Sequence, residues 1–282
     1  MSQSAVLMRS RPRQIVHRTR GRRHGPITRL MSPGDLGQFL KPFVFLDLLD
    51  MGAETSFKGF GLHPHSGIAT VTHIQQGSVR YEDTTGARGI LPEGGVEWFK
   101  AGHGAWHGGG PGESGRTRGF QLWLALPAEH ELGAVESIYQ APDTLRRNGP
   151  AIVLLGGYGA VKSALRTPSP VNYFSVQLKA GESWRYVPPA DHTVAWAALS
   201  VGSVEIPDPI YTENWSPLRL PINRSISTPR WTPSSFWVLP CLIRTNWCWD
   251  ITRCTPAHRH SSRVSAASMR SAPACRRRGA RD

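Results

Sequence analysis

The stretch GIATVTHIQQGSVRYEDTTGARGILPEGGVEWFKAGHGAWHGGG, residues 67–110, decides the fold of this chain. Short apolar segments alternate in it with turn-forming clusters, of which QQG, TTGA, PEGG and AGHG are the clearest. Such a pattern is typical of antiparallel strands joined by hairpins. The even spacing of the turns predicts an all-β fold built as a small barrel or sandwich.

A second stretch of the same kind, residues 171–204, has turns at KAGE and PPAD. Two passes of this pattern predict two related β-domains, a first one over residues 1–140 and a partial second one over residues 141–212. Residues 213–282 show neither the strand nor the helix period. We therefore expect this tail to be disordered.

The charge of the chain is concentrated at its two ends. The chain has 282 residues and a formal net charge of +13, of which the tail, with 12 arginines and three acidic residues, holds +9. Residues 1–23 hold seven arginines and no acidic residue, so residues 24–212 carry about −3. A slightly acidic body argues against a nucleic-acid-binding domain.

The composition also bears on location and on cysteine chemistry. No apolar run reaches the ~18–20 residues of a transmembrane helix, and the N-terminus lacks the apolar core of a secretion signal. We expect a cytoplasmic protein that does not bind membranes. The four cysteines all lie in the tail, at spacings wider than those of zinc knuckles.

The histidines of HPHSG, residues 63–67, are the first candidates for chemistry. Residues two apart on a strand point to the same face, so His63 and His65 can aim both rings at one point. A meander of hairpins can return His103 and His107 beside them, and a cluster of three imidazoles is a common metal site. The alternative is that these are solvated loop histidines, and the spacing alone leaves both interpretations open.

The chain resembles the pirin family of bicupins from about residue 13 to residue 212. The segments that carry the resemblance are VHRTRGRRHGPITRLMSPGDLG, PFVFLDLLD, HPHSGIATVTHIQQGSVRYEDTTGARGIL, VEWFKAGHGAWH, RGFQLWLALP, YGAVKSALRTPSPVNYFSVQLKAGESWRY and HTVAWAALSVG. The resemblance implies two stacked cupin barrels of jelly-roll type, the second of them incomplete here. It also implies one metal ion, usually iron, in the N-terminal barrel. Some pirins cleave the flavonol quercetin with dioxygen, and others are redox-sensitive partners of transcription factors.

The resemblance implies a set of metal ligands. His63, His65 and His107 match the three histidines of the family motif, whereas Gly109 stands where the family has a glutamate. We expect a divalent ion, Fe(II), held less firmly than with a carboxylate ligand. The candidates for a fourth ligand are His103 and Glu113.

Other residues around the site have expected places. The apolar walls of a pocket over the metal are expected among Phe99, Trp106, Phe120 and Trp123, the last two being favoured as core residues. Because Glu97 alternates with Val96 and Trp98, we expect it on the face of its strand opposite to theirs, pointing away from the metal site. We interpret His73 and His192 as structural.

The tail has a second interpretation. We read the last base of each codon together with the first two bases of the next codon. In this frame the codons of NWCWD, residues 246–250, must encode Leu-Val-Leu-Gly, and those of FWV, residues 236–238, must encode Leu-Gly. These strings resemble a pirin C-terminus, so we expect a frameshift after about residue 212.

Two functions follow from the resemblance. The first is a metal-dependent dioxygenase of quercetinase type, acting on a small flavonol-like aromatic substrate. The second is a metal-poor, non-catalytic pirin that binds a protein partner. Binding of nucleic acid is the weakest hypothesis, because the basic charge of the tail is attributed to the expected frameshift.

Overall fold

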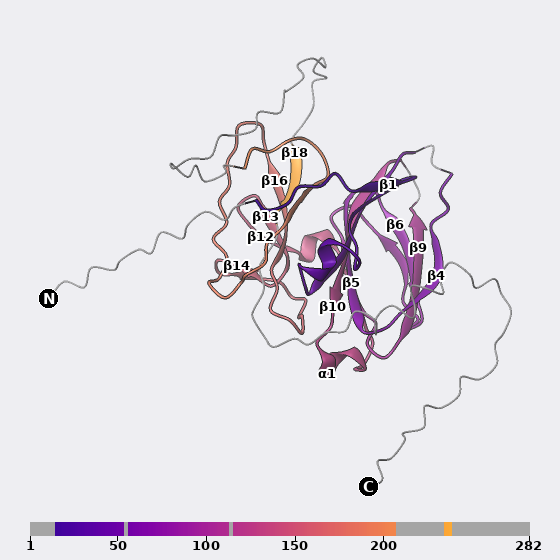
Figure 1. The fold of residues 1–282 in the computed structure, drawn as a ribbon. Coiled ribbons are helices and arrows are strands. Elements are labelled where there is room, and N and C mark those ends of the chain that lie inside the picture. Colours follow the sequence, from indigo (N-terminus) through magenta and orange to yellow (C-terminus); the bar gives the residue numbers. More distant parts are fainter. Residues whose placement is uncertain (1–14, 54–55, 113–114, 207–233, 239–282) are drawn as a thin grey trace, which may run out of the picture. The chain divides into compact units, whose positions relative to one another are not determined.

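The computed structural model describes residues 15–53, 56–112, 115–206 and, for the backbone alone, 234–238. Almost every element in these residues is a β-strand (Figure 1). The predicted all-β fold is therefore confirmed. The sheets that form it are open, and each has two edge strands.

The largest sheet, here called the main sheet, has seven strands in the order β1-β2-β3-β10-β5-β8-β11. All its pairs are antiparallel. Its strands are β1 (Arg22–His24), β2 (Ile27–Met31), β3 (Phe43–Met51), β5 (Ile68–Gln76), β8 (Val96–Lys100), β10 (Thr117–Ala125) and β11 (Glu136–Gln140).

A smaller sheet, here called the site sheet, has four strands in the order β4-β9-β6-β7. These are β4 (Phe60–His65), β6 (Val79–Asp83), β7 (Arg88–Leu91) and β9 (Ala105–Pro111). Side chains of the two sheets meet in hydrogen bonds, such as Ser137 Oγ of β11 to Asp83 Oδ2 of β6 at 2.6 Å. The two sheets therefore face each other, as in a jelly roll.

The C-terminal half is built on a third sheet with the order β12-β13-β16-β18-β17 and a separate hairpin, β14-β15. Its strands are β12 (Arg146–Asn148), β13 (Ala151–Leu155), β14 (Gly157–Tyr158), β15 (Val161–Lys162), β16 (Tyr173–Leu178), β17 (Ala197–Leu199) and β18 (Ser234–Val238). Residues 179–196 form no strand, although the sequence predicts hairpins there. The aromatic rings of Trp184 and Tyr186 in this segment pack instead on Phe174 of β16.

The tail contributes one described element. β18 lies between β16 and β17 and pairs with both, at a position where the sequence predicts no regular structure. The rest of residues 213–282, with all four cysteines, lies outside the described residues. The predicted domain bounds stay a prediction.

Helices are few and short in the described part of the chain. They are the single turns η1 (Leu36–Gln38), α1 (Ala128–Glu131) and η2 (Pro142–Thr144). None of these has the length or the apolar character that crossing a bilayer requires.

The main sheet is covered on both faces, and this arrangement places the site. On one face Val71, Trp98 and Leu122 belong to a core that also contains Leu154 and Tyr173 of the C-terminal half. The other face points to the site sheet. Because both faces are covered, β5 is buried at every position from Ile68 to Ile74.

His73 belongs to this buried framework, as the sequence predicts. It is 2% exposed, and its Nδ1 lies 3.0 Å from the carbonyl oxygen of Gly95. Burial lowers the pKa of His73 to about 4, against a partial rise from that hydrogen bond.

His73 should make the protein less stable in acid. Between pH 6.5 and about 4 the unfolded chain binds a proton at His73 that the folded chain does not. The free energy of unfolding should therefore fall by about 3 kcal/mol across this window as the pH decreases. Urea unfolding at a series of pH values should show a shallower dependence for His73→Gln than for the wild type. Equal slopes would contradict this assignment.

Candidate metal centre

The three histidines of the predicted site come from two neighbouring strands of the site sheet. β4 carries His63 and His65, and β9 carries His107. The two strands pair antiparallel, with His63 directly opposite His107 and His65 opposite Ala105. The pairing brings together residues that are 44 positions apart in the sequence.

The three rings surround one point. Their potential ligand nitrogens all lie within 4.8 Å of one another. The ring centroids are 4.7 Å apart for His63 and His107, and 4.9 Å apart for each of the other two pairs. Nitrogens bound to one ion at ~2.0–2.2 Å lie roughly 3–4 Å apart, so small rotations of the rings suffice for shared coordination.

The donor set of the centre fits a divalent metal ion. His63 Nδ1 lies 2.9 Å from the Gly61 carbonyl oxygen, and His107 Nδ1 lies 3.2 Å from Glu97 Oε1. Because these contacts engage the Nδ1 atoms, the Nε2 atoms of both rings are directed towards the centre. His107 Nε2 is buried and has no hydrogen-bond partner in the part of the chain that the structure describes. A buried nitrogen of this kind is costly unless something binds it, and a metal ion would do so.

Aromatic side chains of the main sheet hold two of the three rings. Phe99 of β8 stacks on His107, with centroids 4.5 Å apart and planes at 6°. The ring of Trp123 of β10 lies 4.8 Å from His65 at 71°. Phe99 was expected as a pocket wall, whereas Trp123 was favoured as a core residue. The structure places both against ligand candidates.

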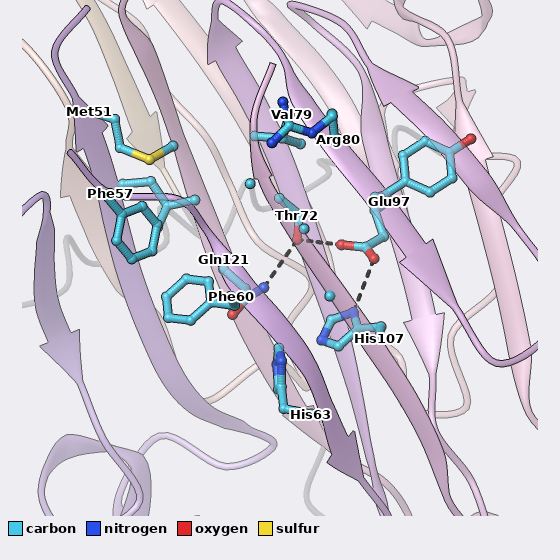
Figure 2. A pocket seen from close by; sticks show the side chains of 15 residues that line it. Met51, Phe57, Phe60, His63, Thr72, Val79, Arg80, Glu97, His107 and Gln121 are labelled. Carbon is cyan, nitrogen blue, oxygen red and sulfur yellow. Dashed lines mark hydrogen bonds and ion pairs between the residues drawn. The ribbon is translucent and has the colours of Figure 1, made fainter. Parts of the chain in front are cut away.

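The structure places Glu97 behind His107, on the face of β8 opposite to Val96 and Trp98 as expected, but that face points towards the site, so the expectation that Glu97 points away from it is wrong. Glu97 is 6% exposed, and its carboxylate accepts from His107 Nδ1 and from Thr72 Oγ1 at 2.6 Å (Figure 2). It also accepts from Tyr139 OH at 3.3 Å. Burial alone would raise the pKa of Glu97, but the hydrogen bond and charge of His107, with the donors Thr72 and Tyr139, hold it below the usual value. These contacts favour the ionised form of the buried Glu97 carboxylate.

The reason for that error is the double coverage of the main sheet. Val96 and Trp98 point to the core shared with the C-terminal half, and not to the space between the two facing sheets. The polar position between them therefore points into the site. Alternating Thr70 and Thr72 on β5 were a signal of the same kind, since polar residues recur at every second position of an otherwise apolar strand.

The fourth ligand predicted from the sequence is not found among the described residues. Gly109 leaves no room for a side chain, because a Cβ there would lie 2.3 Å from the Arg80 carbonyl oxygen. His103 is exposed, outside the histidine cluster, with its Nδ1 3.0 Å from the Gly133 carbonyl oxygen. Glu113 lies outside the described residues. His192 is buried and also lies outside the cluster.

A pocket opens beside His63 and His107. Its polar residues include Thr72, Glu97 and Gln121, and its apolar wall is formed by Met51, Phe57, Phe60, Val79 and Tyr81. Figure 2 shows Met51, Phe57 and Phe60 on the side opposite to Glu97 and His107.

These walls differ from the predicted ones. Trp106 is 48% exposed and does not line the pocket, because it points away from its neighbour His107 on β9. Phe120 is a core residue between the two halves, as favoured from the sequence. The apolar residues of β3, of β4 and of the segment before β4 were missed because their pairing partners are distant in the sequence.

Comparison with known proteins agrees with this architecture. The family model described as Pirin matches residues 25–124. A Pseudomonas aeruginosa protein, whose name assigns it provisionally as a quercetin 2,3-dioxygenase, is 34% identical over 205 residues, which are 67% of this chain and 70% of the relative. A pirin-like protein of Caulobacter vibrioides is 32% identical over 196 residues, covering 64% of this chain and 68% of the relative.

A solved structure is similar as well. The quercetin 2,3-dioxygenase of Acinetobacter baumannii aligns with a TM-score of 0.62 and 25% identity, over 77% of this chain and 80% of that one. By its sequence and its fold, the chain belongs to the pirin family of cupin proteins.

Proposed function

We propose that the chain is a metal-dependent dioxygenase that acts on flavonol-like aromatic compounds, with His63, His65 and His107 as its metal ligands. The observation that carries the proposal is the convergence of three imidazoles, within 4.8 Å, at the end of an apolar pocket. Two of the three proteins compared above, those of Pseudomonas aeruginosa and Acinetobacter baumannii, have quercetin 2,3-dioxygenase in their names, which supports this substrate class. Fe(II) is the ion proposed for the working enzyme.

The metal ion, the apolar wall and Gln121 would have different roles in the proposed reaction. A divalent ion bound there would supply Lewis-acid and redox chemistry. Met51, Phe57 and Phe60 would hold a planar aromatic substrate against the histidines and exclude water from it. Gln121 at the same pocket offers an amide for a hydroxyl or carbonyl group of the substrate.

Among the described residues, Glu97 is the carboxylate that lines the pocket, and it is engaged in hydrogen bonds within the protein. Gly109 carries no side chain, and both oxygens of Glu97 already accept hydrogen bonds from protein groups. Removal of the flavonol hydroxyl proton therefore has no dedicated base in the described part of the pocket. We expect slow turnover for this reason.

Loss of any one ligand should abolish tight metal binding. His63→Ala, His65→Ala and His107→Ala should each raise the dissociation constant for Zn(II) by more than about 100-fold, a larger loss than that of residues behind the ligands. His103→Ala is the matched control, because His103 lies in the same glycine-rich region outside the cluster. Calorimetric titration of the apo protein measures all four. An unchanged constant in His107→Ala would contradict the ligand assignment.

Quercetin cleavage should depend on the metal. The iron-loaded chain should consume quercetin and dioxygen together at a low rate, and chelation or His63→Ala should abolish both. The rates are measured by loss of flavonol absorbance and by an oxygen electrode. No uptake of oxygen above the metal-free control, or turnover that survives chelation, would contradict the proposed function.

A further inference from the structure

The three histidines provide no negative charge to a bound cation. Imidazole ligands are neutral, Gly109 cannot supply a carboxylate, and the described residues place no acidic group inside the histidine cluster. A divalent ion bound by three imidazoles would therefore keep its full charge within a mostly apolar site, unless an anion lies nearby.

Glu97 is the carboxylate nearest to this centre in the hydrogen-bond network. Its Oε1 lies 3.2 Å from His107 Nδ1, on the side of the ring that points away from the cluster. Both groups are buried, with side chains 5% and 8% exposed for His107 and Glu97. The attraction between the Glu97 carboxylate and a cation bound at the centre would therefore be screened far less than in water.

We propose that Glu97 is the positioning residue of the metal centre, supplying through His107 the negative charge that the three-histidine ligand set lacks. The inference rests on the proposed metal site and adds to it a residue that acts on the metal through one of its ligands. Accepting the Nδ1 hydrogen fixes the His107 tautomer with its Nε2 lone pair towards the cluster. It also makes that nitrogen a stronger donor to a cation.

A chain of hydrogen bonds keeps Glu97 in this role. Trp123 Nε1 donates to Gln121 Oε1 at 3.3 Å. Gln121 Nε2 donates to Thr72 Oγ1 at 3.4 Å, and Thr72 Oγ1 donates to Glu97 Oε2 at 2.6 Å (Figure 2). Every donor in this series points towards Glu97, which is the final acceptor. The arrangement suits an ionised carboxylate, because a protonated one would need an acceptor for its own hydrogen.

The same series of hydrogen bonds connects two of the ligand candidates. Trp123 packs against His65, and Glu97 accepts from His107, so the two rings are held by the opposite ends of one network. Strands β10, β5 and β8 each contribute one or more of its members. A change at Glu97 should therefore lower the affinity of the centre for a metal ion, and not only alter the neighbouring ring of His107.

The test is the isosteric substitution Glu97→Gln in the full-length chain, which removes the charge and keeps the shape. Its dissociation constant for Zn(II) should rise by about 10–100-fold, as is typical when a carboxylate behind a histidine ligand is lost. Glu136→Gln is the matched control. Glu136 is also a hydrogen-bonded carboxylate facing β8, but it accepts from Trp98 and Lys100, away from the cluster. This control should keep the wild-type constant.

A second readout follows the hydrogen bond itself. In the zinc-loaded wild type, the Nδ1 proton of His107 should give a downfield proton resonance that exchanges slowly with water, because Glu97 holds it in a buried site. In Glu97→Gln that resonance should move upfield or vanish, whereas Glu136→Gln should retain it. A residue that only stabilises the fold would not change this signal selectively.

A third variant covers the case in which Glu97→Gln does not fold. Thr72→Val removes one donor to Glu97 and leaves the carboxylate in place, so it should weaken zinc binding by less than Glu97→Gln does and shift the same resonance. Wild-type affinity in both Glu97→Gln and Thr72→Val overturns the inference, as does a wild type that binds no zinc. Tight zinc binding that depends on Glu97, in a protein that does not cleave quercetin, overturns the proposed function alone.

Discussion

The pairing of β4 with β9 is the constraint on which the site depends. Because His63 stands opposite His107, three rings on two strands point into the same space. A slip of one residue would turn each strand's side chains to its other face, and the cluster would be lost. Glycines make the close approach of these strands feasible. At Gly59, with φ of +105°, a Cβ would lie 2.2 Å from the Gly109 carbonyl oxygen.

The site also depends on the main sheet, which is buried on both faces. One face packs on the C-terminal half through residues such as Trp98 and Leu122. The other face is free to carry Thr72, Glu97 and Gln121 towards the histidines. Large apolar residues on the first face stabilise the sheet, and this allows polar residues on the second face to form a connected network in a buried place.

The sequence predicted the parts of the site that depend on a local pattern. Turns and alternation indicated an all-β fold, and the spacing of His63 and His65 put both rings on one face. Glu97 was misplaced because alternation says which residues share a face but not which face is the interior. The wall formed by Met51, Phe57 and Phe60 depends on pairings between distant strands, which no local pattern encodes.

The coordination shell of the loaded protein tests the central claim most directly. X-ray absorption spectroscopy of the zinc-loaded full-length chain should show three imidazole ligands at about 2.0–2.2 Å, with the rest of the shell filled by water oxygen. The same spectrum should be obtained from His103→Ala. A shell with fewer than three imidazoles, or one that changes in His103→Ala, would contradict the assignment of His63, His65 and His107 as the metal ligands.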